Sequence, residues 1–444
     1  MRTLILAAAV AFALPAAAQT PPESTPATRA MAAGYKALMV CGAVKNAEAA
    51  GGTRTVESVE ANELVGIYPE IDALVREMPV EVLPARVAVA WDDVMPPRSA
   101  VWRPGRGCTI MPVGWRGEQI ALRSSGAPAN AAFPAAATPA DPEALEDTAE
   151  MAFGGGYGEG ANTTAVLQHD HGRLVGEWYA DGFGPDTPQR TWSVAKSLAG
   201  TIIGAAVQRG EVDVNAPAAI ADWRREGDPR AAITLDQLMR MSSGLTSETA
   251  GNRTDALYFG GVGVDEQVTA WPLIAPPGTR YRYANNDTLL AVLSIAPTFR
   301  DHPPAELFRR LGMYDTWAET DWRGNFVLSS QVWSTARDLA RFGQLYLDDG
   351  MVDGERILPE GWLDYVSRPS GPQPRGEQGY GATFWLFDKS EGIPADAISA
   401  NGNRGQYVVI VPSRSIVIVR RGEDPAGQRF DHVAFTRAVL AALD

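Results

Sequence analysis

Side chains that bind transition metals are scarce in this sequence of 444 residues. It contains two cysteines, Cys41 and Cys108, and four histidines. Two cysteines cannot build a cysteine-rich scaffold or a CxxC metal site, and no HExxH motif occurs. We therefore expect neither a metal nor another cofactor, and hydrolysis by a metal-bound water is disfavoured.

Positive charge is also in short supply. Lys and Arg number 39 against 53 Asp and Glu, so the formal net charge is −14. Nucleic acids and anionic membrane surfaces bind clustered cations, so neither is an expected partner. The GxGxxG and GxxxxGK[ST] motifs of nucleotide-binding enzymes and the GxSxG motif of Ser–His–Asp hydrolases are absent. With 45% hydrophobic and 21% charged residues, the composition is otherwise that of an ordinary globular protein.

Lysine is much rarer than arginine, because only four of the 39 Lys and Arg residues are lysine. Wherever the chain needs plain positive charge it uses arginine. A lysine beside a candidate nucleophile is therefore informative, since lysine can lose its proton on burial and arginine cannot.

The first residues have the pattern of an export signal. Arg2 precedes an apolar run from Leu4 to Leu14 that is too short to span a bilayer, and small residues up to Ala18 form a cleavage site. No cysteine for a lipid anchor follows, and no later run reaches transmembrane length. We expect a periplasmic or secreted protein without a membrane anchor, although an ordinary N-terminal helix is the alternative. In an oxidising compartment Cys41 and Cys108 are expected to pair, with two buried free thiols as the alternative.

Composition divides the chain into segments. Their expected bounds are 1–18 for the signal peptide, 19–34 for a disordered Pro/Thr-rich stretch, 35–123 for a cysteine-containing segment of unassigned fold, 124–144 for an Ala/Pro-rich linker, and 145–444 for the main domain.

Within the main domain the pattern predicts two hairpins and two long helices. The expected strands are 165–167 with 174–178 and 406–411 with 415–420, and the expected helices are 193–209 and 430–443. His169 and His171 are expected on an exposed turn of the first hairpin rather than as metal ligands.

Ser193 and Lys196 open the helix that follows Pro188. Positions i and i+3 share a helix face, so the hydroxyl and the amine can meet. A buried lysine would lose charge and could take the serine's proton. Alone, the pattern also fits a helix-capping serine and a solvated lysine.

Tyr283 and Asn285 lie on a loop between Pro276 and an apolar helical run. Two side chains at i and i+2 can point into one cleft, the phenol as proton carrier and the amide as a hydrogen-bonding group. A packed loop aromatic is the alternative.

These motifs together resemble the β-lactamase-related serine hydrolases. The resemblance covers 145–444 and rests on SVAK, YAN, LDQLMRMSSGL, STARDLARFGQLYLDDG, GERILPEGW and GNRGQYVVIVP; TWSVAKS and GNRGQ look most like the 6-aminohexanoate-dimer hydrolase branch. It implies an α/β (α+β) fold, in which helices flank an antiparallel sheet and a mostly helical subdomain is inserted. It also implies Ser193 as nucleophile, Lys196 as base, Tyr283 and Asn285 as partners, and an oxyanion hole of the Ser193 and Asn403 backbone N–H groups.

One departure from the family pattern concerns the strand that faces the nucleophile. Penicillin-recognising members have Lys or His, then Thr or Ser, then Gly, whereas here Ala400-Asn401-Gly402 align. The cation for a substrate carboxylate is missing, and Arg404 is a candidate replacement. Gly402, Arg404 and Tyr258 are the expected substrate-binding residues, although Tyr258 equally fits a packing role.

The sequence therefore predicts an exported serine hydrolase that cleaves a small-molecule amide or ester through an acyl-enzyme. A β-lactamase or D-alanyl-D-alanine carboxypeptidase, or a catalytically inactive protein that binds cell-wall fragments, are the alternatives. The exact substrate and the oligomeric state do not follow from the sequence.

Overall fold

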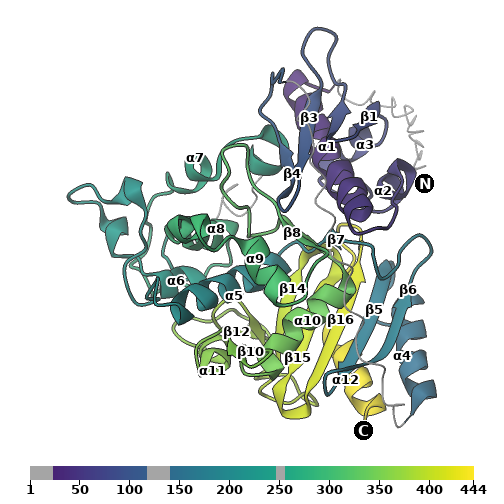
Figure 1. Cartoon of the computed structure of the whole chain (residues 1–444), viewed down its shortest axis with the longest axis vertical. Coiled ribbons are helices and arrows are strands. Elements are labelled where there is room, and N and C mark those ends of the chain that lie inside the picture. The colour runs from purple at the N-terminus through teal and green to yellow at the C-terminus, as the bar shows by residue number, and fades with distance from the viewer. Residues whose placement is uncertain (1–23, 118–140, 247–255) are drawn as a thin grey trace, which may run out of the picture.

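An antiparallel sheet of seven strands forms the centre of the molecule (Figure 1). The computed structural model describes residues 24–117, 141–246 and 256–444. The strand order is β12-β13-β14-β15-β16-β5-β6. Their bounds are β5 (Thr163–Asp170), β6 (Arg173–Tyr179), β12 (Gly379–Tyr380), β13 (Trp385–Leu386), β14 (Ile398–Gly402), β15 (Gln406–Val411) and β16 (Ile416–Gly422).

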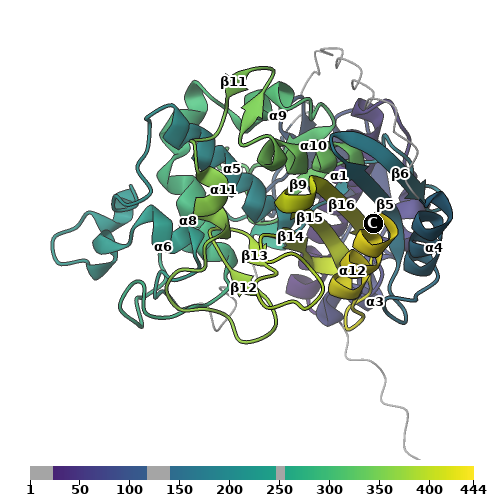
Figure 2. The same cartoon turned by 90° about the horizontal axis from the view of Figure 1, so that it is seen from below.

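Helices cover both faces of this sheet, because its central strands are apolar on both sides. In β15, Val408 and Ile410 face one hydrophobic cluster and Val409 and Val411 face the other, as the two-residue repeat of a strand requires. Helices α5 and α10 belong to the first cluster, and α4 and α12 belong to the second (Figure 2). Their bounds are α4 (Pro142–Phe153), α5 (Val194–Gln208), α10 (Ala336–Leu347) and α12 (His432–Ala442).

Short helices make up most of the chain between α5 and α10, on the left of Figure 1. They are η1 (Ala221–Trp223), η2 (Pro229–Ala232), α6 (Leu235–Met239), η3 (Ala256–Gly260), α7 (Val264–Val268), α8 (Asn285–Ser294), η4 (Ala296–Arg300) and α9 (Pro304–Arg310). A three-stranded sheet, order β7-β9-β8, contacts the main sheet, because Arg421 of β16 donates to the carbonyl oxygens of Gln189 and Ser334. The remaining elements are β7 (Gln189–Arg190), β8 (Thr316–Ala318), β9 (Val332–Ser334), β10 (Met351–Val352), β11 (Glu355–Arg356), α11 (Trp362–Ser367), η5 (Asn403–Gly405) and η6 (Pro412–Arg414).

The N-terminal segment, residues 24–117, folds as a long buried helix against a four-stranded antiparallel sheet of order β1-β2-β3-β4. Helix α1 also packs on β7 and β9, so this segment shares the core of the main domain. The Cys41–Cys108 disulfide joins α1 to β4, which confirms the predicted pairing. The bounds are α1 (Pro26–Ala49), α2 (Val56–Ala61), α3 (Pro69–Val75), β1 (Val80–Leu83), β2 (Arg86–Val89), β3 (Arg98–Arg103) and β4 (Gly107–Ile110).

Three predictions about local structure are wrong. Residues 142–144, expected in the linker, form the first turn of α4, because Asp141 caps that helix. Residues 26–34, expected to be disordered, form the first turns of α1, because Thr25 caps the helix and Ala32 and Ala33 are buried. His169, expected on an exposed turn, is buried in β5, while His171 does lie on the turn. The predicted hairpins and the two long helices are confirmed to within three residues at each end, and the strand 406–411 matches β15 without any offset.

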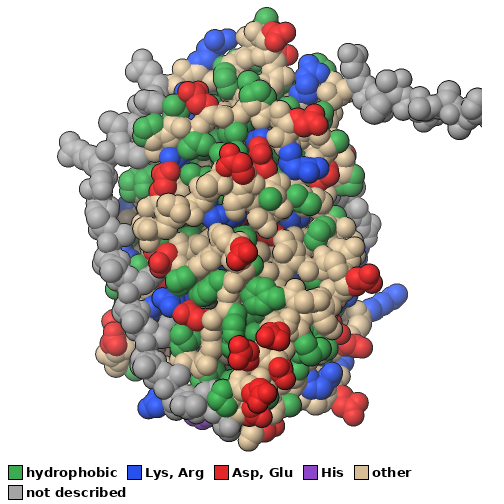
Figure 3. Space-filling model, turned by 90° about the vertical axis from the view of Figure 1, so that its right-hand side faces the viewer, with side chains coloured by type: hydrophobic (Ala, Val, Ile, Leu, Met, Phe, Trp, Pro, Cys, Tyr) green, Lys and Arg blue, Asp and Glu red, His purple; other side chains and the backbone are tan. Residues whose placement is uncertain are grey.

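The proposed signal peptide, 1–18, and linker residues 124–140 lie outside the described residues. Within the described ranges, no helix combines the length and apolarity needed to cross a bilayer. On the face that carries α4 and β6, acidic side chains gather toward the lower end (Figure 3), and α4 contributes the exposed residues Glu143, Glu146 and Glu150.

Candidate active site

The Ser193 side chain lies at the turn between β7 and α5. Ser193 occupies the N-cap position of α5, but its hydroxyl does not cap the helix. Trp192, immediately before it, has a left-handed backbone (φ +49°) and stacks under the Arg190 guanidinium at 3.6 Å. A non-glycine residue adopts this conformation only where its surroundings impose it. Because the Ser193 hydroxyl makes no capping hydrogen bond, the simple helix-capping alternative is wrong.

Lys196 lies one turn into α5, with its side chain only 1% exposed. Its Nζ is 3.0 Å from Ser193 Oγ, 2.6 Å from Asn285 Oδ1 and 2.8 Å from the Ser329 carbonyl oxygen. Asn285 begins α8, so the helical subdomain supplies one of these oxygens. The structure thus brings together three of the four predicted catalytic side chains.

Burial lowers the pKa of Lys196 to about 7. Desolvation disfavours the charged amine, so a large neutral fraction is present at physiological pH. A neutral amine has two N–H donors and one lone pair. The Asn285 and Ser329 oxygens can only accept hydrogen bonds, so they take both N–H groups and leave the lone pair for the Ser193 hydroxyl.

Tyr283 lies beside both Lys196 and Ser193. Its ring centre is 5.1 Å from Lys196 Nζ, and it packs against Tyr380 and Trp385. Burial raises the pKa of Tyr283 to about 12, partly offset by side-chain hydrogen bonds to Ser193 and Trp385. Tyr283 is therefore a neutral phenol near pH 7, able to pass a proton on.

A cleft of about 510 Å³ opens in front of Ser193. Its walls are mostly aromatic rings and neutral amides. They comprise Tyr68, Trp192, Ser193, Tyr258, Tyr283, Asn285, Ser330, Gln378, Trp385, Asn401, Gly402, Asn403, Tyr407, Arg429 and His432. A concave site of this size suits a small-molecule ligand.

Gly402, at the end of β14, lies directly against the nucleophile turn. A methyl group on its Cα would overlap the Thr191 carbonyl oxygen and lie 3.2 Å from the Ser193 nitrogen. Only glycine permits this approach, which explains the residue type at this position. Asn403, the next residue, lines the same cleft as Ser193, as its predicted place in an oxyanion hole requires.

Tyr258, from η3, forms part of the cleft wall. Its hydroxyl is hydrogen-bonded to Ser330 Oγ, and its ring lies 4.7 Å from the Arg190 guanidinium. Both the pocket role and the packing role considered from the sequence are thus compatible with its position.

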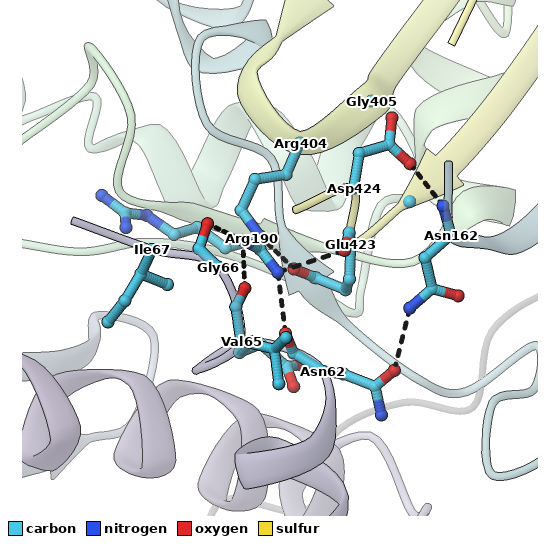
Figure 4. Close-up of polar contacts among 12 residues, drawn as sticks. Asn62, Val65, Gly66, Ile67, Asn162, Arg190, Arg404, Gly405, Glu423 and Asp424 are labelled. Atoms are coloured by element: carbon cyan, nitrogen blue, oxygen red, sulfur yellow. Dashed lines mark hydrogen bonds and ion pairs between the residues drawn. The ribbon is translucent and has the colours of Figure 1, made fainter. Parts of the chain in front are cut away.

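Arg404 does not line the cleft, so it is not the substrate-binding cation expected from the sequence. Its buried guanidinium pairs with Glu423 at 2.8 Å and donates to the carbonyl oxygens of Asn62, Val65 and Gly66 (Figure 4). The Arg404 guanidinium is thus paired with Glu423 and backbone oxygens outside the cleft. The cation that does line the cleft is Arg429, which is exposed.

His432, in the predicted C-terminal helix, is a further residue of the site that the sequence analysis did not identify. It starts α12, lines the cleft and stacks on Tyr407 with ring centres 4.3 Å apart. Burial lowers the pKa of His432 to about 4, and its Nε2 lies 3.2 Å from Gln378 Oε1. A neutral imidazole held in this way is a wall of the site. Among the described residues, no group of His, Cys, Asp or Glu is arranged to hold a metal ion.

Tyr68, Ser329 and Trp385 are site residues that sequence reasoning missed. Tyr68 belongs to the segment without an assigned fold, and Ser329 acts through its backbone, which carries no side-chain signal. Trp385 lies far from the YAN motif in sequence, so no local pattern indicated it.

Known proteins are similar to this chain in sequence. A family model described as Beta-lactamase matches residues 152–442. The 6-aminohexanoate-dimer hydrolase of Paenarthrobacter ureafaciens is 25% identical over 308 residues, which cover 59% of this chain and 73% of that enzyme.

Solved structures are similar as well. A candidate 6-aminohexanoate-dimer hydrolase from Bacillus anthracis superposes with a TM-score of 0.57 at 24% identity, covering 70% of this chain and 87% of the other. A class C beta-lactamase gives a TM-score of 0.53 at 14% identity, covering 68% and 96%. These likenesses confirm the predicted fold, the beta-lactamase/transpeptidase-like combination of helices and antiparallel sheet.

Proposed function

Because this chain belongs to the beta-lactamase family of serine hydrolases, we propose that it cleaves a small amide or ester through an acyl-enzyme on Ser193. The observation that carries the proposal is the environment of Lys196 Nζ. Two pure acceptors take its N–H groups, and its third neighbour, at 3.0 Å, is the Ser193 hydroxyl. A protein that only bound cell-wall fragments would not need a desolvated amine aimed at a serine.

In the proposed reaction, neutral Lys196 accepts the Ser193 proton while Oγ bonds to the substrate carbonyl carbon. The resulting oxyanion accepts hydrogen bonds from the Ser193 and Asn403 backbone N–H groups. Tyr283 transfers the proton from Lys196 to the leaving nitrogen or oxygen, and the bond to the leaving group breaks. Water then attacks the acyl-enzyme with the same groups acting in reverse, which releases the acid and restores Ser193.

Lys196 suits the role of base better than Tyr283. Near pH 7 the lysine amine, with a pKa of about 7, is substantially neutral, whereas the phenol, with a pKa of about 12, is almost wholly protonated. The general base should have its pKa near the operating pH.

The mostly uncharged lining of the cleft supports a preference for short or neutral acyl groups. Asn401 and Gln378 line it with neutral amides. Ala400, which aligns with the cation of penicillin-recognising relatives, is an apolar residue buried in the core. An anionic β-lactam loses a charge-assisted contact, worth about 1.5–3 kcal/mol or roughly 10–150-fold in kcat/KM. The β-lactamase reading stays the second candidate, because Arg429 lines the cleft and could contact a carboxylate.

A fluorophosphonate probe tests the nucleophile. Intact mass should show a single adduct that maps to Ser193, and Ser193→Ala should abolish both the adduct and hydrolysis. Labelling of another serine, or labelling that persists in the variant, contradicts the proposal.

Substrate class is tested on the same preparation. We expect kcat/KM for a short p-nitrophenyl ester or a 6-aminohexanoate-type amide to exceed that for nitrocefin. Nitrocefin turnover more than tenfold above both would instead assign a β-lactamase.

A further inference from the structure

The N-terminal segment reaches the catalytic cleft, although it lies outside the region that matches the family. The match starts at residue 152, whereas Asn62, Val65, Gly66 and Tyr68 belong to the chain before it. These residues meet the main domain at the turn η5 (Asn403–Gly405), which directly follows β14.

Arg404 is the centre of this contact (Figure 4). Its Nη2 donates to the Asn62 carbonyl oxygen at 2.7 Å, and its Nη1 donates to Val65 at 2.8 Å and to Gly66 at 3.3 Å. Its Nε pairs with the buried carboxylate of Glu423 at 2.8 Å. The Arg404 guanidinium thus links Glu423, the residue after β16, to three backbone carbonyl groups of the N-terminal segment. Lysine, with a single nitrogen, cannot reproduce this planar set of donors.

The backbone at Arg404 is strained. Its φ is +56°, in the left-handed region that disfavours a residue with a side chain. Such a conformation persists where the surroundings over-determine it. Arg420 donates to the Gly405 carbonyl oxygen at 2.8 Å, and Gln406 Nε2 donates to the Arg404 carbonyl oxygen at 3.2 Å. The side-chain contacts of Arg404 are a further support, and they are the ones that come from the N-terminal segment.

The N-terminal segment is itself docked at this point. The Ala426 N–H donates to the Gly66 carbonyl oxygen at 2.8 Å. Gly66 has φ +59°, and a methyl group on its Cα would lie 2.7 Å from Pro425 Cβ. Two residues on, Tyr68 lines the cleft and packs edge-to-face on Phe259 with ring centres 4.9 Å apart.

We propose that residues 62–68 of the N-terminal segment complete the active site by holding η5, through Arg404, in the position that presents the Asn403 N–H to the substrate oxyanion. Arg404 is then a positioning residue: it touches no substrate, but it is the chain neighbour of Asn403. Oxyanion stabilisation depends on donors fixed in advance, so loosening the turn should slow acylation more than it weakens substrate binding. This inference rests on the proposed acyl-enzyme mechanism.

The first test compares Arg404→Lys with Arg98→Lys. Arg98 is a matched control, because it is also buried and also donates to backbone carbonyls, those of Ala30 and Met111, but within the N-terminal segment alone. Single-turnover acylation by p-nitrophenyl acetate gives the rate constant and the apparent Kd separately, and phenylboronic acid reports affinity for a tetrahedral adduct. Fluorophosphonate titration corrects for the folded fraction.

We expect Arg404→Lys to lower the acylation rate constant and the boronate affinity by about tenfold or more, with the ester Kd within about threefold. Arg98→Lys should stay within about threefold of the wild type in all three. Acylation by Arg404→Lys close to the wild-type rate, or an equal loss in both variants, overturns the inference. A wild-type protein that forms no acyl-enzyme shows instead that the proposed function is wrong.

A second pair of variants leaves the main domain unaltered and applies where Arg404→Lys does not fold. Gly66→Ala should displace the Val65 and Gly66 carbonyls and slow acylation in the same way. Gly105→Ala is its control, since Gly105 has φ +70° but no atom within 4 Å of the added methyl. Unchanged acylation in a folded Gly66→Ala protein contradicts the proposal, as does an equal effect of Gly105→Ala.

Discussion

The burial of Lys196 predicts that activity rises with pH. Its pKa is lowered to about 7, so the amine is protonated and inactive as a base below that pH and neutral above it. We expect kcat/KM to rise with pH from 5 to 8 and to level off after an inflection near 7, as measured with a neutral ester.

Lys196→Arg should lose activity nearly as completely as Lys196→Ala, because arginine keeps the charge but cannot accept a proton. An arginine variant with most of its activity would show that charge alone matters.

Tyr283 allows a separate test of proton transfer. Tyr283→Phe keeps the ring contacts with Tyr380 and Trp385 but removes the hydroxyl, so we expect kcat to fall about 10²–10⁴-fold with little change in Tm. Tyr281→Phe is the matched control, because the buried Tyr281 hydroxyl has no hydrogen-bond partner among the described residues. Steady-state kinetics and thermal melts on both variants decide the matter. Equal kinetic losses would assign Tyr283 a packing role.

At the scale of single elements, the end of β14 has no room for a side chain at Gly402. Gly402→Ala places a methyl group against Thr191 and 3.2 Å from the Ser193 nitrogen, so β14 or the nucleophile turn must shift. A displacement of this kind costs about 10²-fold in kcat when reacting groups must align within fractions of an ångström. Gly184→Ala is the control, since the nearest atom to its added methyl is 3.9 Å away. Fluorophosphonate labelling rates measure the effect directly, and similar rates for both variants would contradict the argued contact.

Elements with a strong local pattern could be predicted from the sequence. The strand from Gln406 to Val411 is apolar throughout, and the helix after Ser193 ends at Gly210, which has φ +73° as a helix-ending glycine requires. His169 was misassigned, because β5 continues past the residues that alternate and buries a histidine at its end. The burial of a single polar residue depends on what packs over the strand, which local periodicity does not contain.

At the scale of the whole molecule, the N-terminal segment was the part that the sequence could not place. Helix α1 is buried along most of its length, between β2 and β3 on one side and β7 and β9 on another. A helix buried on several faces lacks the polar stripe by which amphipathic helices are recognised. The sequence analysis assigned Arg404 to substrate binding for a different reason. Its backbone partners Asn62, Val65 and Gly66 are more than 300 residues away in sequence, and no local pattern shows such a contact.

The Cys41–Cys108 disulfide links α1 to β4 within this segment, so removing it should destabilise the protein. The loop it closes spans 67 residues, so replacing both cysteines by alanine should lower the free energy of unfolding by roughly 4 kcal/mol, measured by urea denaturation. We propose that the protein is exported, so material recovered from the periplasm or medium should contain no free thiols under denaturing conditions before reduction. Two free thiols in freshly isolated protein would contradict the pairing.

Both sulfurs are buried in the segment that holds Arg404, so removing the disulfide should also affect the active site. We expect the double variant to lose its acylation rate at a lower urea concentration than the wild type does. In the variant, acylation should also be lost at a lower urea concentration than the circular dichroism of the β-sheet. Simultaneous loss of both signals in the variant would show instead that the N-terminal segment and the main sheet unfold as one unit.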